Sequence, residues 1–161
     1  APQDFKMEKV AQVYFTTQEY TNVRTRIGVI FYISPKGDET LTAEIISLAA
    51  QVIPAQENVP SQIQVEFEIK NSSNVHIRPR GSVHILNPAS REPVQEWLLD
   101  KVPGVYPGRT FQWREYKELA GLEPGKYEVL MTLDYGHTYG KSLLMEKKAT
   151  LDWQPKEVGT S

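Results

Sequence analysis

Histidines and carboxylates are the side chains of this 161-residue chain that could carry acid–base or metal chemistry. Two of the three histidines, His76 and His84, alternate with apolar neighbours and are predicted to point outward from strands. We expect no Asp or Glu beside them on those faces, so they make a poor metal site. Asp134 and His137 flank a strand end, but their loop lacks the many oxygen ligands that calcium requires. The sequence therefore predicts neither a metal nor any other cofactor.

Other catalytic arrangements are also missing from the sequence. The chain has no Cys, which excludes disulfides, thiol catalysis and thiolate metal sites. No Ser lies in a nucleophile elbow, and no glycine-rich phosphate loop is present. Glu66 and Glu68 point to the same side of one predicted strand, which indicates a solvated face rather than the carboxylate pair of a glycosidase cleft. We therefore expect a protein that is not an enzyme.

Aromatic residues leave a second functional class open. Trp97 lies in a weak alternating pattern and is expected to be exposed, and with Tyr106 and Tyr139 it could form a platform for sugar rings. This is the basis for an alternative function, a cell-surface glycan- or peptidoglycan-binding module. Asn71 begins an Asn-Ser-Ser sequon at a predicted turn, so it is a candidate glycosylation site if the source glycosylates surface proteins.

Composition is that of an ordinary globular protein, with 40% hydrophobic and 24% charged residues. The formal net charge of −2 gives no electrostatic case for binding nucleic acid or an anionic membrane. The longest apolar run, Ile27 to Ile33, is too short to span a bilayer, so membrane insertion is not expected. A chain that begins with Ala1 and Pro2 rather than Met is consistent with a processed product or a trimmed one.

The stretch from Leu119 to Gly136 organises the elements that would position any site. It opens with a Pro-Gly turn at 123–126, and from Tyr127 onward it alternates with the period of two that is typical of a half-buried strand. Tyr127 directly after this turn indicates a tyrosine corner, in which the hydroxyl bonds back to the preceding connection of a Greek-key sandwich.

Short alternating segments separated by turn residues follow one another after residue 40, and no stretch keeps a convincing helical period. Ala43–Val52 is the nearest helical alternative, but Pro54 limits its length and favours a strand. The cleanest alternation, Gln62–Lys70, places Ile63, Val65, Phe67 and Ile69 inward. The predicted strands are Leu41–Leu48, Gln62–Lys70, Gly81–Leu86, Val94–Leu99, Arg109–Tyr116, Tyr127–Tyr135 and Lys141–Trp153. We predict an all-β antiparallel sandwich of about seven strands over 40–153, an N-terminal β arm over 1–39, and a tail over 154–161.

The N-terminal arm contains the candidate partner-binding residues. A short aromatic strand candidate at 10–15 is followed by Arg26 to Ile33, which is apolar on both faces and therefore needs cover on both. Two strands make a hairpin or ribbon rather than an independent domain, so the arm must pair with its own following domain or with another chain. We expect Arg26 to Ile33 to pair with a sheet edge, preferably one of another chain, and Gly28 to mark a close approach or a bulge. The predicted partner-binding residues are Arg26, Ile27, Val29, Phe31 and Ile33.

Four motifs then indicate a family: N-S-S-N-V-H-I-R-P-R-G from residue 71, P-G-V-Y-P-G-R-T-F from 103, L-E-P-G-K-Y from 122 and L-D-Y-G from 133. Together they resemble the second domain of periplasmic pilus-chaperone-like (PapD-like) proteins, over about residues 24 to 153. The arm is similar to the last strand of the chaperones' first domain, most of which is missing here. Arg26 matches one member of the family's carboxylate-anchoring basic pair.

The resemblance implies an immunoglobulin-like sandwich located outside the cytoplasm, in the periplasm or at the cell surface. It also implies strand donation, in which alternating hydrophobic residues are given to a partner subunit. We therefore expect an assembly or structural protein, of the pilus-subunit, surface-filament or chaperone-like type. Its expected partners are other copies of itself or a related subunit, with a glycan as the alternative ligand.

Overall fold

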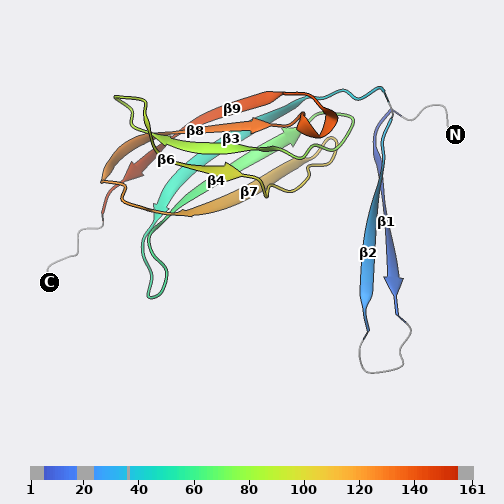
Figure 1. Cartoon of the computed structure of the whole chain (residues 1–161), viewed down its shortest axis with the longest axis horizontal. Coiled ribbons are helices and arrows are strands. Elements are labelled where there is room, and N and C mark those ends of the chain that lie inside the picture. Colours follow the sequence, from blue (N-terminus) through green and yellow to red (C-terminus); the bar gives the residue numbers. More distant parts are fainter. Residues whose placement is uncertain (1–5, 18–23, 36, 156–161) are drawn as a thin grey trace.

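The computed structural model describes residues 6–17, 24–35 and 37–155, and these form an all-β structure (Figure 1). Within these ranges there is no α-helix, only a short 3-10 turn at His137–Tyr139. The described part of the chain accordingly contains no helix long and apolar enough to cross a bilayer. The nine strands are β1 (Lys9–Thr16), β2 (Arg26–Ile33), β3 (Ala43–Ile53), β4 (Gln62–Asn71), β5 (Arg80–Leu86), β6 (Pro93–Leu99), β7 (Thr110–Glu118), β8 (Gly125–Asp134) and β9 (Leu144–Trp153).

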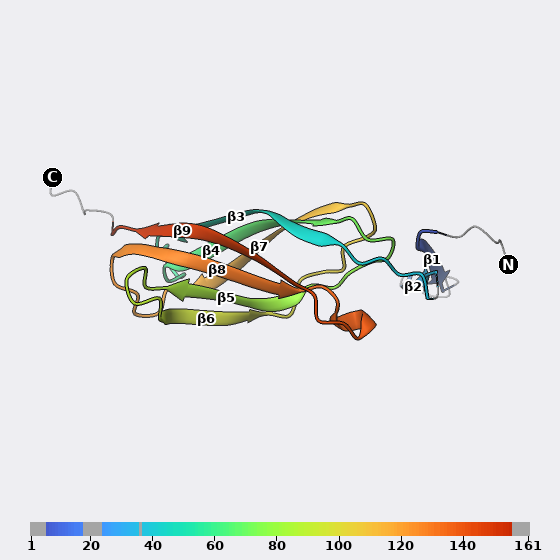
Figure 2. The same cartoon turned by 90° about the horizontal axis from the view of Figure 1, so that it is seen from above.

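The strands form three antiparallel sheets. β1 and β2 make a hairpin, β3, β4 and β7 make a three-stranded sheet in the order β3-β4-β7, and the remaining strands make a four-stranded sheet in the order β6-β5-β8-β9. The two larger sheets lie face to face in a sandwich-like arrangement (Figure 2), with β3 and β9 side by side where the sheets meet along one side. The all-β prediction is confirmed. The described residues form nine strands, of which seven lie in the two larger sheets and two in the hairpin.

Alternation in β4 produces the inner face of the sandwich, as the sequence predicts. Ile63, Val65, Phe67 and Ile69 are completely buried, while Glu66 and Glu68 lie at the solvent side. Trp113 stands opposite Phe67 in the ladder between β4 and β7 and packs against the same core. From the facing sheet, Val83, Ile85, Val129, Met131, Leu133 and Leu151 fill the other half of the core.

The prediction that Trp97 is exposed is wrong. Its side chain points inward from β6 and retains only 8% of its accessible surface. The alternation of β6 explains this burial, because Trp97 and Leu99 share the inner face while Leu98 between them is 75% exposed. In this short strand three apolar residues follow one another from Trp97 to Leu99, so alternation alone does not reveal which face is covered.

The tyrosine corner is confirmed. The Tyr127 hydroxyl donates a hydrogen bond to the Glu123 carbonyl at 2.6 Å, across the Pro-Gly turn that precedes β8. The Trp153 indole N–H donates to the neighbouring Leu122 carbonyl at 3.0 Å. Two aromatic side chains thus fix the connection that leads into the central strand.

Asn71 is the last residue of β4, and its side chain is fully buried. Its side-chain amide donates to the carbonyls of Val75 and Val105 at 2.9 and 2.8 Å, and its side-chain oxygen accepts from the Ser73 N–H. Both N–H groups of the side-chain amide are therefore hydrogen-bonded to loop carbonyls inside the fold. The predicted glycosylation site is contradicted, because no glycan can be attached to this buried nitrogen in the folded protein.

The segment Ala43–Val52 is part of β3, as predicted over the helical alternative. It pairs with β4 along its length, and its register shifts between Ile45 and Ser47. Such an irregularity puts two apolar neighbours, Ile45 and Ile46, out of strict alternation, and this is the feature that imitates a helical period in the sequence.

Replacing Phe67 with Ala should destabilise the protein by about 3–5 kcal/mol, because the completely buried ring leaves a cavity between the sheets. Chemical denaturation monitored by circular dichroism measures the loss. The control is Glu68→Ala, one residue along on the solvent side, which should change the free energy of unfolding by less than about 0.5 kcal/mol. Equal losses would contradict the assigned inner face of β4.

Replacing Tyr127 with Phe removes only the hydroxyl that closes the corner, and should cost about 0.5–1.5 kcal/mol. Denaturant midpoints of the two proteins measure this difference. The matched control is Tyr116→Phe on β7, whose exposed ring receives a hydrogen bond from the Gln64 side chain rather than closing a turn. A Tyr127→Phe protein as stable as the parent would show that the corner bond contributes nothing net.

Candidate interaction site: an exposed apolar hairpin

The hairpin of β1 and β2 stands away from the two packed sheets (Figures 1 and 2). The two strands pair antiparallel in uninterrupted register, from Lys9 opposite Ile33 to Thr16 opposite Arg26. β2 thus forms its ladder with β1 of the same chain, and the predicted ladder with another chain is not seen on this edge. Its other edge carries no ladder among the described residues, so its backbone groups remain available to a further strand.

One face of the hairpin is almost wholly apolar. Directly opposed residues of an antiparallel pair share a face, so the register places seven apolar side chains together. This apolar face consists of Ala11, Val13, Phe15, Ile27, Val29, Phe31 and Ile33. All of them are exposed, the larger ones by 37% (Val29) to 60% (Phe15 and Ile27). Four of the five predicted partner-binding residues therefore lie together on this face, and Arg26 does not.

The opposite face of the hairpin is mixed in character, and Arg26 belongs to it. The Arg26 guanidinium lies 3.8 Å from the centre of the Tyr14 ring, which is the geometry of a cation–π contact. Tyr14 also lies against Gly28, where a Cβ atom would approach the ring to 3.0 Å. The predicted close approach at Gly28 is confirmed, and its cause is the Tyr14 ring lying flat across the ladder.

A buried carboxylate anchors the foot of the hairpin to the sandwich. The side chain of Glu8 is completely inaccessible, and it accepts hydrogen bonds from the His76 backbone N–H at 3.0 Å and the Ser34 hydroxyl at 2.6 Å. Nδ1 of the His76 ring lies 2.8 Å from a carboxylate oxygen of Glu8. The backbone N–H of Glu8 donates to the Asn74 carbonyl at 2.8 Å. Both ends of the hairpin are therefore joined to the loop between β4 and β5.

Aromatic rings reinforce this joint. Tyr32, the last mixed-face residue of β2, stacks on the His76 ring with centroids 4.2 Å apart. Tyr139 donates its hydroxyl to the His76 carbonyl at 2.6 Å, and burial, with Glu8 and Glu39 nearby, raises the pKa of Tyr139 to about 12. A hydrogen bond with Tyr32, with burial adding to it, also raises the pKa of Tyr106. Both phenols therefore stay neutral at physiological pH, and the Tyr139 hydroxyl keeps its proton for the His76 carbonyl.

No local pattern predicts the Glu8–His76 pair, and the expectation that no acid lies beside His76 and His84 is wrong. His76 lies in the loop between β4 and β5 rather than on a strand as predicted, and Glu8 reaches it from the segment before β1. Glu96 on β6 lies 3.2 Å from the ring of His84, which is on the neighbouring strand β5. His76 and His84 thus have one carboxylate neighbour each. Across the described ranges, no group of three metal-ligating side chains comes together.

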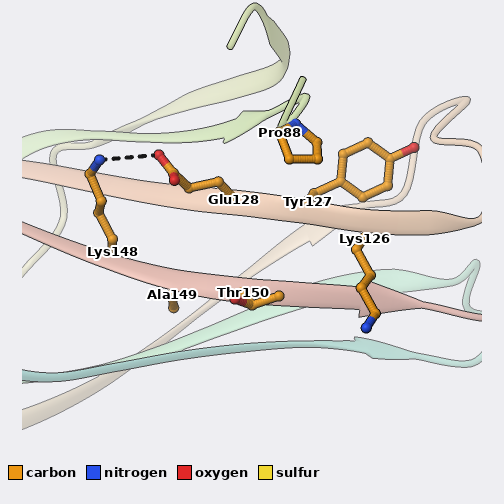
Figure 3. Close-up of a pocket in the computed structure, with 7 residues that line it drawn as sticks. All are labelled: Pro88, Lys126, Tyr127, Glu128, Lys148, Ala149 and Thr150. Carbon is orange, nitrogen blue, oxygen red and sulfur yellow. Dashed lines mark ion pairs between the residues drawn. The ribbon is translucent and has the colours of Figure 1, made fainter. Parts of the chain in front are cut away.

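Surface hollows elsewhere are open to solvent. One of about 290 Å³ is lined by Ser82, His84 and Glu96, with the Ser82 hydroxyl 2.8 Å from His84 Nε2 and a Glu96 carboxylate oxygen 3.2 Å from His84 Nδ1. Figure 3 shows another of about 290 Å³, lined by residues of β8, β9 and Pro88, in which Lys148 and Glu128 extend toward each other. Their charged atoms are 3.4 Å apart, and the same Glu128 oxygen also pairs with Arg91 at 3.2 Å, so the charges of this hollow are held in surface ion pairs. Tyr127, also on its wall, uses its hydroxyl in the corner described above. The hairpin is thus the candidate site, and its chemistry is that of a hydrophobic contact with an open strand edge.

The predicted sugar platform is not assembled. Of the three aromatic residues, Trp97 is buried, Tyr139 is half-buried with its hydroxyl bonded to the His76 carbonyl, and Tyr106 is exposed. Comparison of the chain with protein-family models, with curated proteins and with solved structures finds no match.

Replacing Glu8 with Ala should loosen the hairpin while the sandwich stays folded. The substitution leaves the His76 N–H and the Ser34 hydroxyl without their acceptor, at a local cost of about 1–3 kcal/mol. Hydrogen exchange should then accelerate at residues 8 and 76, and amides in β4 and β8 should keep their protection. Glu44→Ala, an exposed carboxylate on β3, is the control. Unchanged exchange at residue 76 would show that Glu8 does not hold the joint.

Proposed function

We propose that this protein is a non-enzymatic assembly protein that adds a β-strand of its hairpin to another copy of the same chain. The observation that carries this proposal is the apolar face, seven exposed apolar side chains on a two-stranded ribbon. A two-stranded ribbon is only marginally stable in water, and an exposed apolar patch of this kind usually marks an interaction surface.

Strand addition is the mode that this geometry supports best. The free edge of β2 offers a row of N–H and C=O groups, and Ile27, Val29, Phe31 and Ile33 repeat at the two-residue spacing that successive pockets of a partner sheet would receive. Main-chain hydrogen bonds would supply affinity, and the alternating side chains would fix the register, because a slip by one residue exchanges the two faces.

A second copy is the partner we favour, because the chain carries open sheet edges of its own on the side of the sandwich formed by β6 and β7. Donor and acceptor then belong to one sequence, as in a filament subunit. A related subunit with a similar edge is the other possible partner, and mixing experiments distinguish it from self-assembly.

For the sandwich itself we propose an immunoglobulin-like fold. The tyrosine corner before β8 and the strand order β3-β4-β7 facing β6-β5-β8-β9 support this assignment. An extracytoplasmic location and kinship with PapD-like proteins are proposed on the four motifs and the donor-like strand alone.

Charging the apolar face should abolish assembly without unfolding the sandwich. In Val29→Asp combined with Phe31→Asp, two carboxylates would have to be buried at the interface, which is strongly unfavourable without partners. Analytical ultracentrifugation should show the parent above monomer mass and the variant as a monomer. Circular dichroism and thermal unfolding should report the same sandwich for both.

The matched control places two charges on the mixed face of β1, as Gln12→Asp with Thr16→Asp. This protein should assemble as the parent does, because those positions lie away from the apolar face. Assembly that survives in the Val29/Phe31 variant, or a parent that is monomeric at every concentration, would contradict the proposed function. Binding of cell-wall glycan by a monomeric parent would favour the alternative class.

A further inference from the structure

We propose that the acceptor for the hairpin is the open edge of β6 in a second copy of this chain. This inference rests on the proposed function, and it adds the surface that the donated strand meets. Four strands form the edges of the two packed sheets, namely β3 and β7 in one and β6 and β9 in the other. These four edges differ in cover and in charge.

The edges of β3 and β9 lie beside each other where the two sheets meet, so they shield one another. β7 is open but is guarded by charge, since Arg114, Glu115, Lys117 and Glu118 follow closely along it. Natural edge strands use such charges to prevent pairing with other chains. β6 is open as well, and Glu96 is its only charged residue. Among the four edges of the two packed sheets in the described structure, β6 is the open one with the least charge. Pro93 at its start and the register shift beside Val94 leave Gln95 to Leu99 as the part that can pair.

The surroundings of β6 are those of a strand that lacks a neighbour. Leu98 is 75% exposed, and Val94 is also exposed on the same outer face. Hollows of about 460 and 290 Å³, both lined in part by Leu98, lie between β6 and β5. These hollows lie on the side of Leu98 that faces β5, and a strand added to the open edge of β6 would cover the other side of this leucine.

Two polar atoms on the inner side of β6 also lack partners. The indole N–H of Trp97 and the side-chain oxygen of Gln95 are buried without a hydrogen bond. Such atoms are rare in native structures because each costs free energy, and a group brought to this edge could satisfy them. The Gln95 amide is already used, since it donates to the Glu118 carbonyl at the end of β7.

Charge and alternation on β2 are complementary to β6. Arg26 is the only charged residue of β2, and it lies on the mixed face, opposite in sign to Glu96. With β2 paired along β6, its apolar row would face the inner side of the sandwich, beside Trp97. The mixed row, with Arg26, would turn toward the outer face that carries Glu96 and Leu98. Because donor and acceptor are different surfaces, the contact is head-to-tail and either propagates or closes into a ring.

The first test replaces Leu98 with Lys, a side chain that natural proteins place on edges to block pairing. The substitution should weaken self-association by at least about tenfold in sedimentation experiments. The matched control is Leu144→Lys on β9, a comparably exposed leucine (63%) on the opposite edge of the same sheet, which should assemble as the parent does. Circular dichroism checks that both variants are folded.

The second test locates the contact directly. Since the chain has no Cys, introduced thiols are the only ones that a short bismaleimide can join. Ile30→Cys protein is mixed with Leu98→Cys protein, and separately with Leu144→Cys protein. We expect cross-linked dimers from the first mixture and not from the second.

The outcomes separate the two proposals. Cross-links formed only between Ile30→Cys molecules, with Leu98→Lys assembling as the parent does, would overturn the β6 acceptor and leave hairpin-mediated assembly intact. Cross-linking to Leu144→Cys instead would also overturn it. A parent chain that stays monomeric overturns the proposed function and this inference together.

Discussion

A buried carboxylate sets the geometry of this molecule. Glu8 lies without access to water just before β1, and a charge in that position is tolerated only when hydrogen-bond donors surround it. The donors come from Ser34 at the end of the hairpin and from His76 in the loop between β4 and β5. Joining both ends of the hairpin to one loop fixes its foot and projects the ribbon away from the sandwich.

The same alternation rule has opposite outcomes in β4 and β2. In β4 the apolar row enters a core that a facing sheet completes, and Phe67 loses all contact with water. In β2 a row of similar length, including Phe31, has no facing sheet among the described residues and stays exposed. The sandwich buries its apolar side chains between its own two sheets, whereas the hairpin leaves its apolar face exposed. This difference is the physical basis for proposing the hairpin as the interaction site.

The sheet edges follow a related logic. The covered edges of β3 and β9 need little further protection, and the open edge of β7 carries charges of both signs. β6 is open and nearly uncharged, and it contains an exposed leucine, Leu98, and a buried indole without an acceptor, that of Trp97. One chain therefore presents both an unsatisfied strand pair and an open edge with little charge, which is the combination that head-to-tail assembly requires.

The sequence by itself determined the strands and their inner faces wherever alternation was long and regular. Gln62–Lys70 and the corner at Tyr127 were predictable because a period of two and a Pro-Gly turn are local properties of the chain. The sequence also identified the row from Ile27 to Ile33 as an unusually apolar strand. Three features depended instead on tertiary structure: the burial of Trp97, the enclosure of Asn71, and the joint between Glu8 and His76. Alternation says which side chains share a face, but not which element covers that face. The partners of Glu8 and Asn71 come from segments up to 68 residues away, brought close only by the folded chain.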